Sequence, residues 1–251
     1  MSIVVNGIPT NARDLKNIFK TVMETATCTP EQKEAIEIMF DTAVLAPERF
    51  TKRADAKRDI TEYLTKWVAN FINSLNNPPS KTVAKAKQAP TDPALRKMIQ
   101  AMFGYDDEAA DGAEELHDLF MAAENIQGGL LEEYIFSKAK AYGWVWCAGN
   151  SLRAIDFLKY EGRQVYLVQI KNKYNTENSS SSAIREGTTV EKWFRIGRKV
   201  RKGVVTPDFR WDELNVKMGM PEDNEFSERD YQAFLVRCIT ENPGLLKGKS
   251  N

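Results

Sequence analysis

The sequence has one histidine, three cysteines and no long apolar run, and each shortage excludes a class of protein. A single histidine, His117, excludes metal sites built from several histidines and any chemistry that needs two of them. Cys28, Cys147 and Cys238 lie far apart and form no CxxC pair, so neither a disulfide framework nor a zinc site is indicated. No stretch approaches the roughly 20 apolar residues of a membrane-spanning helix.

Several short motifs are also missing. The sequence has no GxxxxGK[ST] phosphate loop, no GxGxxG after a strand and no GxSxG elbow, so functions driven by ATP or NAD are not expected. The first residues lack the basic-then-apolar order of a signal peptide. A hydrophobic content of 42% is enough for a sizeable core. We therefore expect a soluble, intracellular chain without a nucleotide cofactor.

Charge is balanced over the chain but not along it. The sequence has 35 basic and 35 acidic residues, yet residues 137–203 contain 14 basic residues and only 5 acidic ones. Such a basic segment is typical of a surface that meets nucleic-acid phosphates, although a solvated, charge-balanced face would look similar in sequence.

Periodicity separates a helical first half from a mixed second half. Apolar residues at helical spacing predict helices over residues 11–25, 30–45 and 54–75, with Thr29 as the cap of the second. Four prolines in residues 76–93 indicate an extended connection. Further helices are predicted over 94–103 and 108–124, followed by a glycine-started helix that ends at Gly143. We expect residues 1–93 to form a helical region with a linker.

Three strands are predicted after Gly143, because residues 143–173 are rich in aromatic and β-branched side chains. In the third strand, alternation places Gln169 and Lys171 on one face. If Glu161-Gly162 forms a two-residue turn, Asp156 lies opposite Leu167 and shares that face. A three-residue loop would instead send Asp156 to the other side of the sheet.

This arrangement suggests a divalent-metal site at the end of a hairpin. Asp156 can supply an anionic oxygen and Gln169 a neutral one to Mg²⁺, which prefers oxygen ligands and keeps several waters. Lys171 would lie beside the attacking water and stabilise negative charge on a phosphate. The alternative is an ordinary cross-strand ion pair between Asp156 and Lys171, with Gln169 hydrogen-bonded beside it.

The same residues resemble a known family. Asp156, a hairpin, "QIK" at 169–171 and "GGLLEEYI" at 128–135 resemble the PD-(D/E)XK core of type II restriction endonucleases. Residues 169–196 are similar, more narrowly, to the SinI-like restriction endonucleases, which cut GG(A/T)CC. The resemblance implies that Asp156 binds the metal, that Lys171 is the catalytic lysine and that Glu132 or Glu133 assists the metal. We favour Glu132.

The family pattern has an acidic residue where this sequence has Gln169. A neutral amide binds Mg²⁺ less strongly than a carboxylate does, so this departure bears mainly on how many metal ions the site holds. The fold implied is α/β, a restriction-endonuclease-like core with a mixed central sheet flanked by helices, over residues 94–251.

The function implied is Mg²⁺-dependent hydrolysis of DNA at a short specific double-stranded site, by a homodimer in a prokaryotic cytoplasm. Two alternatives stay open at this point. The chain could be a catalytically inactive DNA-binding protein of the same fold. It could also be a repair or recombination nuclease that recognises DNA structure.

DNA recognition is predicted in residues 172–203, which are rich in compact polar and basic side chains. Arg185 is the best candidate for reading a base, because arginine binds guanine through two hydrogen bonds. A flexible serine-rich loop followed by a solvated basic helix is the alternative. The candidate DNA-binding residues are Lys173, Asn175, Asn178, Ser179, Ser180, Ser181, Ser182, Arg185, Thr188, Lys192, Arg195, Arg198 and Lys199.

Overall fold

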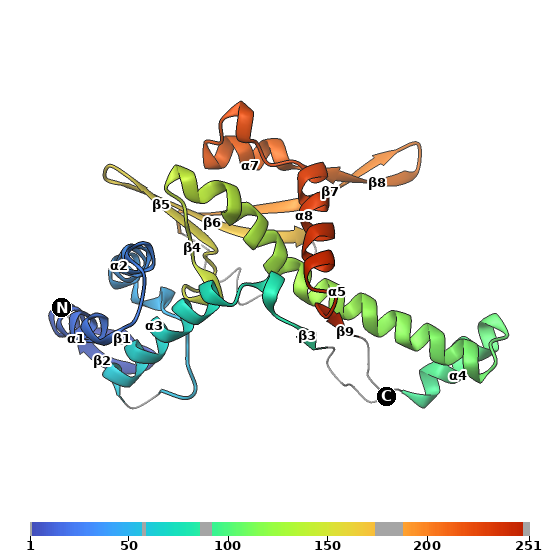
Figure 1. Cartoon of the computed structure of the whole chain (residues 1–251), viewed down its shortest axis with the longest axis horizontal. Coiled ribbons are helices and arrows are strands. Elements are labelled where there is room, and N and C mark those ends of the chain that lie inside the picture. The colour runs from blue at the N-terminus through green and yellow to red at the C-terminus, as the bar shows by residue number, and fades with distance from the viewer. Residues whose placement is uncertain (1, 57–58, 86–91, 174–187, 248–251) are drawn as a thin grey trace. The chain divides into compact units, whose positions relative to one another are not determined.

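The computed structural model describes residues 2–56, 59–85, 92–173 and 188–247. The chain divides into two compact units, each built from two stretches of sequence (Figure 1). The first unit contains Met1–Asn77 and Tyr134–Glu228, and the second contains Pro78–Glu133 and Arg229–Asn251. These units do not coincide with the ranges 1–93 and 94–251, whose division into functional modules stays a prediction.

The first unit begins with a β-hairpin and three helices. The side chain of Asn11 accepts the Asp14 N–H at the start of the first helix, and Thr29 and Gln32 form a capping box at the second. The predicted helices 11–25 and 30–45 are thus confirmed, together with the Thr29 cap. The third helix begins at Ile60, after the cap Asp59, and not at residue 54. The elements are β1 (Ser2–Val5), β2 (Ile8–Asn11), α1 (Ala12–Thr25), α2 (Pro30–Leu45), η1 (Pro47–Arg49) and α3 (Ile60–Asn76).

The N-terminal helices belong to the same unit as the predicted strands. The indole N–H of Trp67 in α3 donates to the carbonyl of Ser151 at 2.7 Å, and Phe50 forms an isolated β-bridge with Leu152. The ring of Phe50 also packs edge-on against Tyr63 and Trp67. A cluster of aromatic side chains therefore joins the helical region to the segment that precedes β5.

A five-stranded mixed sheet forms the centre of the first unit (Figure 1). The strand order is β4-β5-β6-β7-β8, with β6 and β7 parallel and the other neighbours antiparallel. Helix α7 (Trp211–Met218) packs on it, since the rings of Trp193 and Trp211 lie 5.2 Å apart. The strands are β4 (Val145–Trp146), β5 (Phe157–Glu161), β6 (Gln164–Lys173), β7 (Val190–Arg201) and β8 (Val204–Phe209).

This architecture confirms the predicted fold class, a mixed α/β core with a central sheet flanked by helices. It also confirms the three strands predicted after residue 143. Short 3₁₀ turns connect the elements of the first unit, namely η3 (Lys140–Tyr142), η4 (Ala148–Asn150) and η5 (Glu222–Asn224).

The second unit is helical. Its long helix α5 (Asp107–Ala139) extends across the boundary between the units, and replaces the two helices predicted over 108–124 and 125–143. Gly128 and Gly129 therefore lie inside a helix. A Cβ atom on Gly129 would lie 2.8 Å from Cγ of Pro79, so glycine is needed there for close packing and does not start a new helix.

The other elements of this unit are short or lie at its ends. A two-residue parallel pairing joins β3 to β9, and α4 packs next to the start of α5 through ion pairs of Arg96. These elements are η2 (Pro79–Lys81), β3 (Ala84–Lys85), α4 (Pro93–Phe103), α8 (Glu228–Glu241) and β9 (Leu246–Lys247). Throughout the described ranges, no helix has the length and apolar character that crossing a membrane requires.

Candidate active site

The β5–β6 hairpin places Asp156 next to the polar end of β6. The turn is Gly162-Arg163, because Glu161 pairs with Gln164, and the predicted turn Glu161-Gly162 is wrong. The paired register begins with Phe157 opposite Val168, so Asp156 lies just before the strand and is not opposite Leu167 as predicted. The Asp156 side chain meets β6 at Ile170, whose N–H donates to its carboxylate and which lies between Gln169 and Lys171 in the sequence.

Backbone and side-chain hydrogen bonds hold Asp156 in place. Its N–H donates to the carbonyl of Val168 at 2.9 Å, and its carbonyl accepts the N–H of Cys147 at 2.8 Å. One carboxylate oxygen, Oδ2, accepts the N–H of Ile170 at 2.6 Å. Two residues earlier, Ala154 has φ 60°, a left-handed conformation that residues with a side chain seldom adopt. The chain is thus bent sharply just before a firmly oriented carboxylate.

The environment of Asp156 disfavours its charge. Burial raises the pKa of this carboxyl from 3.8 to about 6, while the hydrogen bond from Ile170 and the positive charge of Lys171 lower it. A carboxylate that is costly to ionise without a partner gains most from a bound cation. Asp156 therefore fits the role of a metal ligand better than that of a solvated surface acid.

Gln169 and Lys171 lie on β6, beside β7. Gln169 is 3% exposed and pairs in register with Lys192, and Lys171 is half-buried and pairs with Phe194. Asp156 and Lys171, both among the described residues, form no ion pair within 4.0 Å. The cross-strand ion pair that we considered as the alternative is therefore not formed.

The donor atoms at this position fit a hard divalent cation. Within the described ranges, no group of three or more histidine, cysteine, aspartate or glutamate side chains could hold a metal ion. Asp156 instead offers one carboxylate, which binds the N–H of Ile170, and the neighbouring residue Gln169 offers one buried amide. Mg²⁺ commonly binds through one or two carboxylates and retains waters, so this sparse set suits Mg²⁺ better than a cation that needs many protein ligands.

The predicted helix glutamates lie in the second unit. The carboxylate of Glu133 accepts the backbone N–H of Ser80 at 2.8 Å and its hydroxyl at 2.5 Å. Adjacent helix positions point about 100° apart, so Glu132 faces a different direction from Glu133. The structure gives Glu133 a packing role, and the assignment of Glu132 to the metal site stays a prediction from the resemblance.

Seven of the thirteen candidate DNA-binding residues lie outside the described residues. Asn175, Asn178, Ser179, Ser180, Ser181, Ser182 and Arg185 are in this group. Of the others, Lys173 ends β6, Thr188 accepts the N–H of Val190 at 3.3 Å, and Lys192 lies on β7 above the ring of Phe194. Arg198 and Lys199 are exposed further along β7. The basic helix of the alternative interpretation is thus a strand.

Arg195 is an exception among the predicted DNA contacts. Its side chain is buried, with the residue 4% exposed, and it donates two hydrogen bonds to Glu228 at 2.6 and 2.7 Å and one to Asn172 at 2.8 Å. A phosphate cannot reach a guanidinium that is buried and already bound to a carboxylate. The structure assigns Arg195 to the core of the first unit, which corrects our prediction.

Strand β8 and the hairpin that it forms with β7 were not predicted from the sequence. The turn residues Lys202 and Gly203 have φ 50° and 79°, the combination found in two-residue hairpin turns. A lysine–glycine pair between two valine-containing segments was the available signal.

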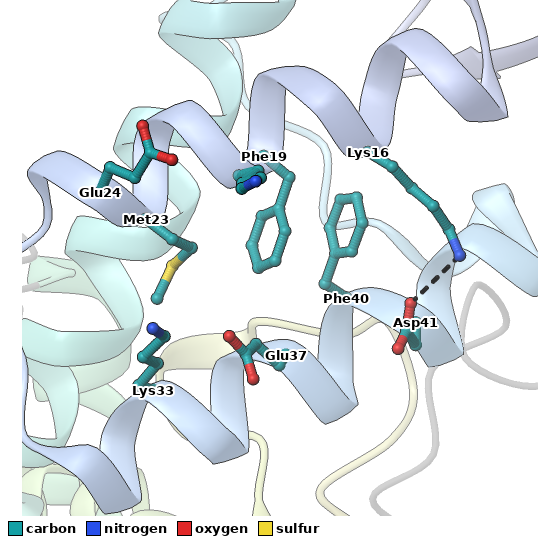
Figure 2. Close-up of a pocket in the computed structure, with 9 residues that line it drawn as sticks. Lys16, Phe19, Met23, Glu24, Lys33, Glu37, Phe40 and Asp41 are labelled. Atoms are coloured by element: carbon teal, nitrogen blue, oxygen red, sulfur yellow. Dashed lines mark ion pairs between the residues drawn. The ribbon is translucent and has the colours of Figure 1, made fainter.

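Helices α1 and α2 line a separate hollow of about 490 Å³ (Figure 2). The rings of Phe19 and Phe40 stack at 3.7 Å on its floor, and Lys16 and Asp41 form an ion pair of 3.6 Å at its rim. Neither Asp156 nor any residue of β6 lines this hollow. It is not part of the candidate active site.

The known proteins to which this chain is similar are restriction endonucleases. A family model described as SinI restriction endonuclease matches residues 33–241. The type II restriction enzyme Eco47I of Escherichia coli is 37% identical over 152 residues, which cover 60% of this chain and 62% of that enzyme. The type II restriction enzyme SinI of Salmonella infantis is 33% identical over 229 residues, which cover 80% of this chain and 96% of that enzyme.

These matches confirm the resemblance that the sequence indicates, and they extend it. The family model includes most of the N-terminal helical region, for which the sequence analysis found no motif. The match spans less than two thirds of Eco47I but nearly the whole of SinI. The chain therefore belongs to the SinI restriction endonuclease family, and this membership implies a nuclease.

Proposed function

We propose that the chain is a Mg²⁺-dependent type II site-specific deoxyribonuclease that hydrolyses phosphodiester bonds within a short double-stranded site of the GG(A/T)CC type. The observation that supports this proposal is the hydrogen bond between the Asp156 carboxylate and the N–H of Ile170, which lies between Gln169 and Lys171, in a chain of this family. A cytoplasmic location and the absence of a nucleotide cofactor are part of the same expectation.

Each residue of the hairpin has a distinct role in the proposal. Asp156 and Gln169 would hold Mg²⁺, and Glu132 would join them, as the family resemblance implies. A bound Mg²⁺ polarises a phosphoryl oxygen and lowers the pKa of its water. Lys171 orients the attacking water and stabilises the negative charge that develops on the phosphate. The hydrogen bond from Ile170 fixes Oδ2 of Asp156 and so sets the direction of the carboxylate.

Recognition is proposed to come from residues 172–203. Arg185 and the asparagine and serine side chains near it would contact base edges, which carry the sequence information. Lys173, Lys192, Arg198 and Lys199 would contact phosphates, which hold the duplex in register but do not specify its sequence.

A homodimer is proposed because one active site addresses one strand of a symmetric duplex site. Helices α4 and α5 supply a surface for it, since α4 buries no residue and both helices expose large apolar side chains. A large apolar side chain has roughly 200 Å² of surface, and about half of each of the eight side chains named below is exposed. Together they expose about 800 Å², which is as much surface as one partner buries in a stable interface. These side chains are Leu95, Met98, Met102, Phe103, Leu116, Leu119, Phe120 and Met121.

The charge of this surface supports a protein partner. Residues 106–124 contain eight acidic residues and no lysine or arginine, so they would repel DNA. Arg96 offsets part of the charge through ion pairs with Asp107, Asp111 and Glu114. A second copy of the chain would cover the apolar side chains without bringing phosphates near the acids.

The test is cleavage of phage DNA by the purified chain with and without Mg²⁺. We expect discrete fragments for the wild type and none for Asp156→Asn or Lys171→Ala, both of which should still shift a duplex that contains the site. Lys159→Ala is the matched control, because Lys159 lies on β5 in an ion pair with the exposed Glu161, and it should cut normally.

Each other outcome has a defined meaning. Intact DNA with a gel shift for the wild type would indicate binding alone, and a smear would indicate cleavage directed by structure. Normal cleavage by Asp156→Asn or Lys171→Ala would remove that side chain from the site.

A further inference from the structure

Strands β7 and β8 continue beyond the sheet as a two-stranded ribbon (Figure 1). Among the described residues, β6 and β7 are paired as far as Lys173 and Ile196, whereas β7 and β8 stay paired up to Arg201 and Val204. Among the described strands, the part of β7 after Ile196 pairs with β8 alone. This segment, residues 198–206, is called the ribbon below.

The ribbon combines cations with exposed valines. Residues 192–207 contain six lysines and arginines and no acidic residue, and four of these cations are in the ribbon. Val200, Val204 and Val205 are 55–62% exposed, although β-branched side chains usually pack against a neighbour. Valines that the described part of the chain leaves this exposed, between cations, point to a ligand that is anionic at its edge and apolar within.

The register relates the ribbon to the candidate active site. Val200 pairs with Val205, and both share a face with Arg198, because alternate residues of a strand lie on the same side. Further along β7 the same alternation includes Lys192, which pairs with Gln169 on β6. The valine pair therefore lies on the face of the sheet that carries Gln169 and Lys171.

We propose that the ribbon enters the major groove of the DNA substrate, with Val200 and Val205 against base edges and Lys199, Arg201 and Lys202 at the flanking phosphates. The major groove admits a two-stranded ribbon, and its apolar feature is the C5 methyl group of thymine. The inference rests on the proposed function and adds to it a set of apolar specificity residues outside the segment around Arg185.

A second copy of the ribbon is a poorer partner. Strand β8 is at the edge of the described sheet, but pairing it with another β8 would bring two strongly basic hairpins together. Cations on an edge strand oppose such pairing. A duplex, by contrast, supplies negative charge on both sides of the groove that the ribbon would fill.

The test compares two duplexes that contain the cleaved site. One carries thymidine, and the other carries deoxyuridine at every thymidine in and beside the site, which removes only the methyl groups. We expect the wild type to bind the thymidine duplex more tightly, by about fourfold for each methyl contacted. Val200→Ser/Val205→Ser removes both methyl groups of each valine, and it should lose this preference.

Two further variants separate the roles within the ribbon. Val216→Ser is the matched control, because Val216 is an 84% exposed valine on α7, and it should keep the preference. Lys199→Ala/Lys202→Ala should weaken binding to both duplexes by the same factor, so the ratio of the two affinities should not change. It should also reduce the slope of log K against log salt by about two.

Three results would overturn the inference. The first is an equal preference for thymidine in the wild type and the double valine variant. The second is unchanged binding and cleavage in every ribbon variant. The third is a change in oligomeric state on sedimentation, which would make the ribbon a contact between copies. If the wild type neither binds nor cuts a specific site, the proposed function itself fails, and that outcome is distinct from these three.

Discussion

At the scale of single residues, Asp156 shows how the site couples chemistry to stability. Its folded-state pKa is about 6, above the ordinary value of 3.8, so the folded chain binds this proton more tightly than the unfolded chain. The stability of the metal-free protein should therefore fall as the pH rises from about 4 through about 6, and stay lower above that.

Asp156→Asn removes this dependence, because an amide keeps an acceptor for the Ile170 N–H but does not ionise. At pH 7.5 without metal, we expect the free energy of unfolding of the variant to exceed that of the wild type by about 2–3 kcal/mol, and to match it near pH 4. Urea unfolding at both pH values measures this. Glu161→Gln, at the exposed end of the same hairpin, should have the same pH dependence of the free energy of unfolding as the wild type. If the difference between Asp156→Asn and the wild type were the same at both pH values, the Asp156 carboxyl would not be the group that titrates.

Arg195 and Arg198 lie on one strand but have different surroundings. Arg195→Met removes the cation that pairs with the part-buried carboxylate of Glu228, which keeps the indole N–H of Trp211, so the free energy of unfolding should fall by about 3 kcal/mol. Arg198→Met, on the exposed part of β7, should change stability by less than about 0.5 kcal/mol and should lower affinity for DNA. Chemical denaturation and a binding titration check the pair. The reverse pattern would restore Arg195 as a phosphate contact.

Glu132 and Glu133 offer a similar comparison on α5. Glu133→Ala removes both hydrogen bonds to Ser80 and should lower the free energy of unfolding by about 1–3 kcal/mol. Glu132→Ala should instead reduce Mg²⁺-dependent cleavage at saturating DNA. Thermal unfolding and single-turnover kinetics separate the two effects. Equal and small losses of cleavage in both variants would remove the helix glutamate from the proposed site.

At the scale of an element, α5 carries two glycines with opposite expectations. A methyl group on Gly128 meets no atom within 4 Å, so Gly128→Ala should raise the free energy of unfolding by about 0.5–1 kcal/mol through helix propensity. Gly129→Ala would place its Cβ 2.8 Å from the Pro79 ring and should lower it by about 1–3 kcal/mol. Urea denaturation of both variants tests this. Stabilisation by both would show that η2 does not need its close contact with α5.

At the scale of the whole molecule, the proposed dimer depends on the apolar surface of α4 and α5. Leu116→Gln/Phe120→Gln replaces two exposed side chains one turn apart on α5, and should shift the protein from dimer to monomer. The monomer should nick supercoiled plasmid more readily than it linearises it. Light scattering and plasmid cleavage measure the two effects. Leu45→Gln, an exposed leucine of α2, is the control, and a dimeric α5 variant would place the interface elsewhere.

The sequence by itself determined most of the local structure and the residue types of the site. Helix caps such as Thr29 and alternation such as that of Gln169 and Lys171 are encoded within a few residues, so they can be predicted without tertiary contacts. The resemblance around Asp156 also needed only sequence, and the comparisons confirmed it at the level of the family. The roles of Asp156, Gln169, Lys171 and Glu132 remain predictions.

Only the tertiary structure decided which residues depart from the structure that their local sequence predicts. Gly128 and Gly129 indicate the start of a helix by local rules, but both lie inside α5. Glycine is needed at position 129 because Pro79, distant in sequence, packs against it. Arg195 and Arg198 lie in the same basic stretch of sequence, but Arg195 binds Glu228, which is 33 residues away in sequence. The turn at Gly162-Arg163 was decided by pairing along the whole β5–β6 hairpin. In each case a contact distant in sequence outweighs a local preference, because burial and pairing contribute more free energy than propensity does.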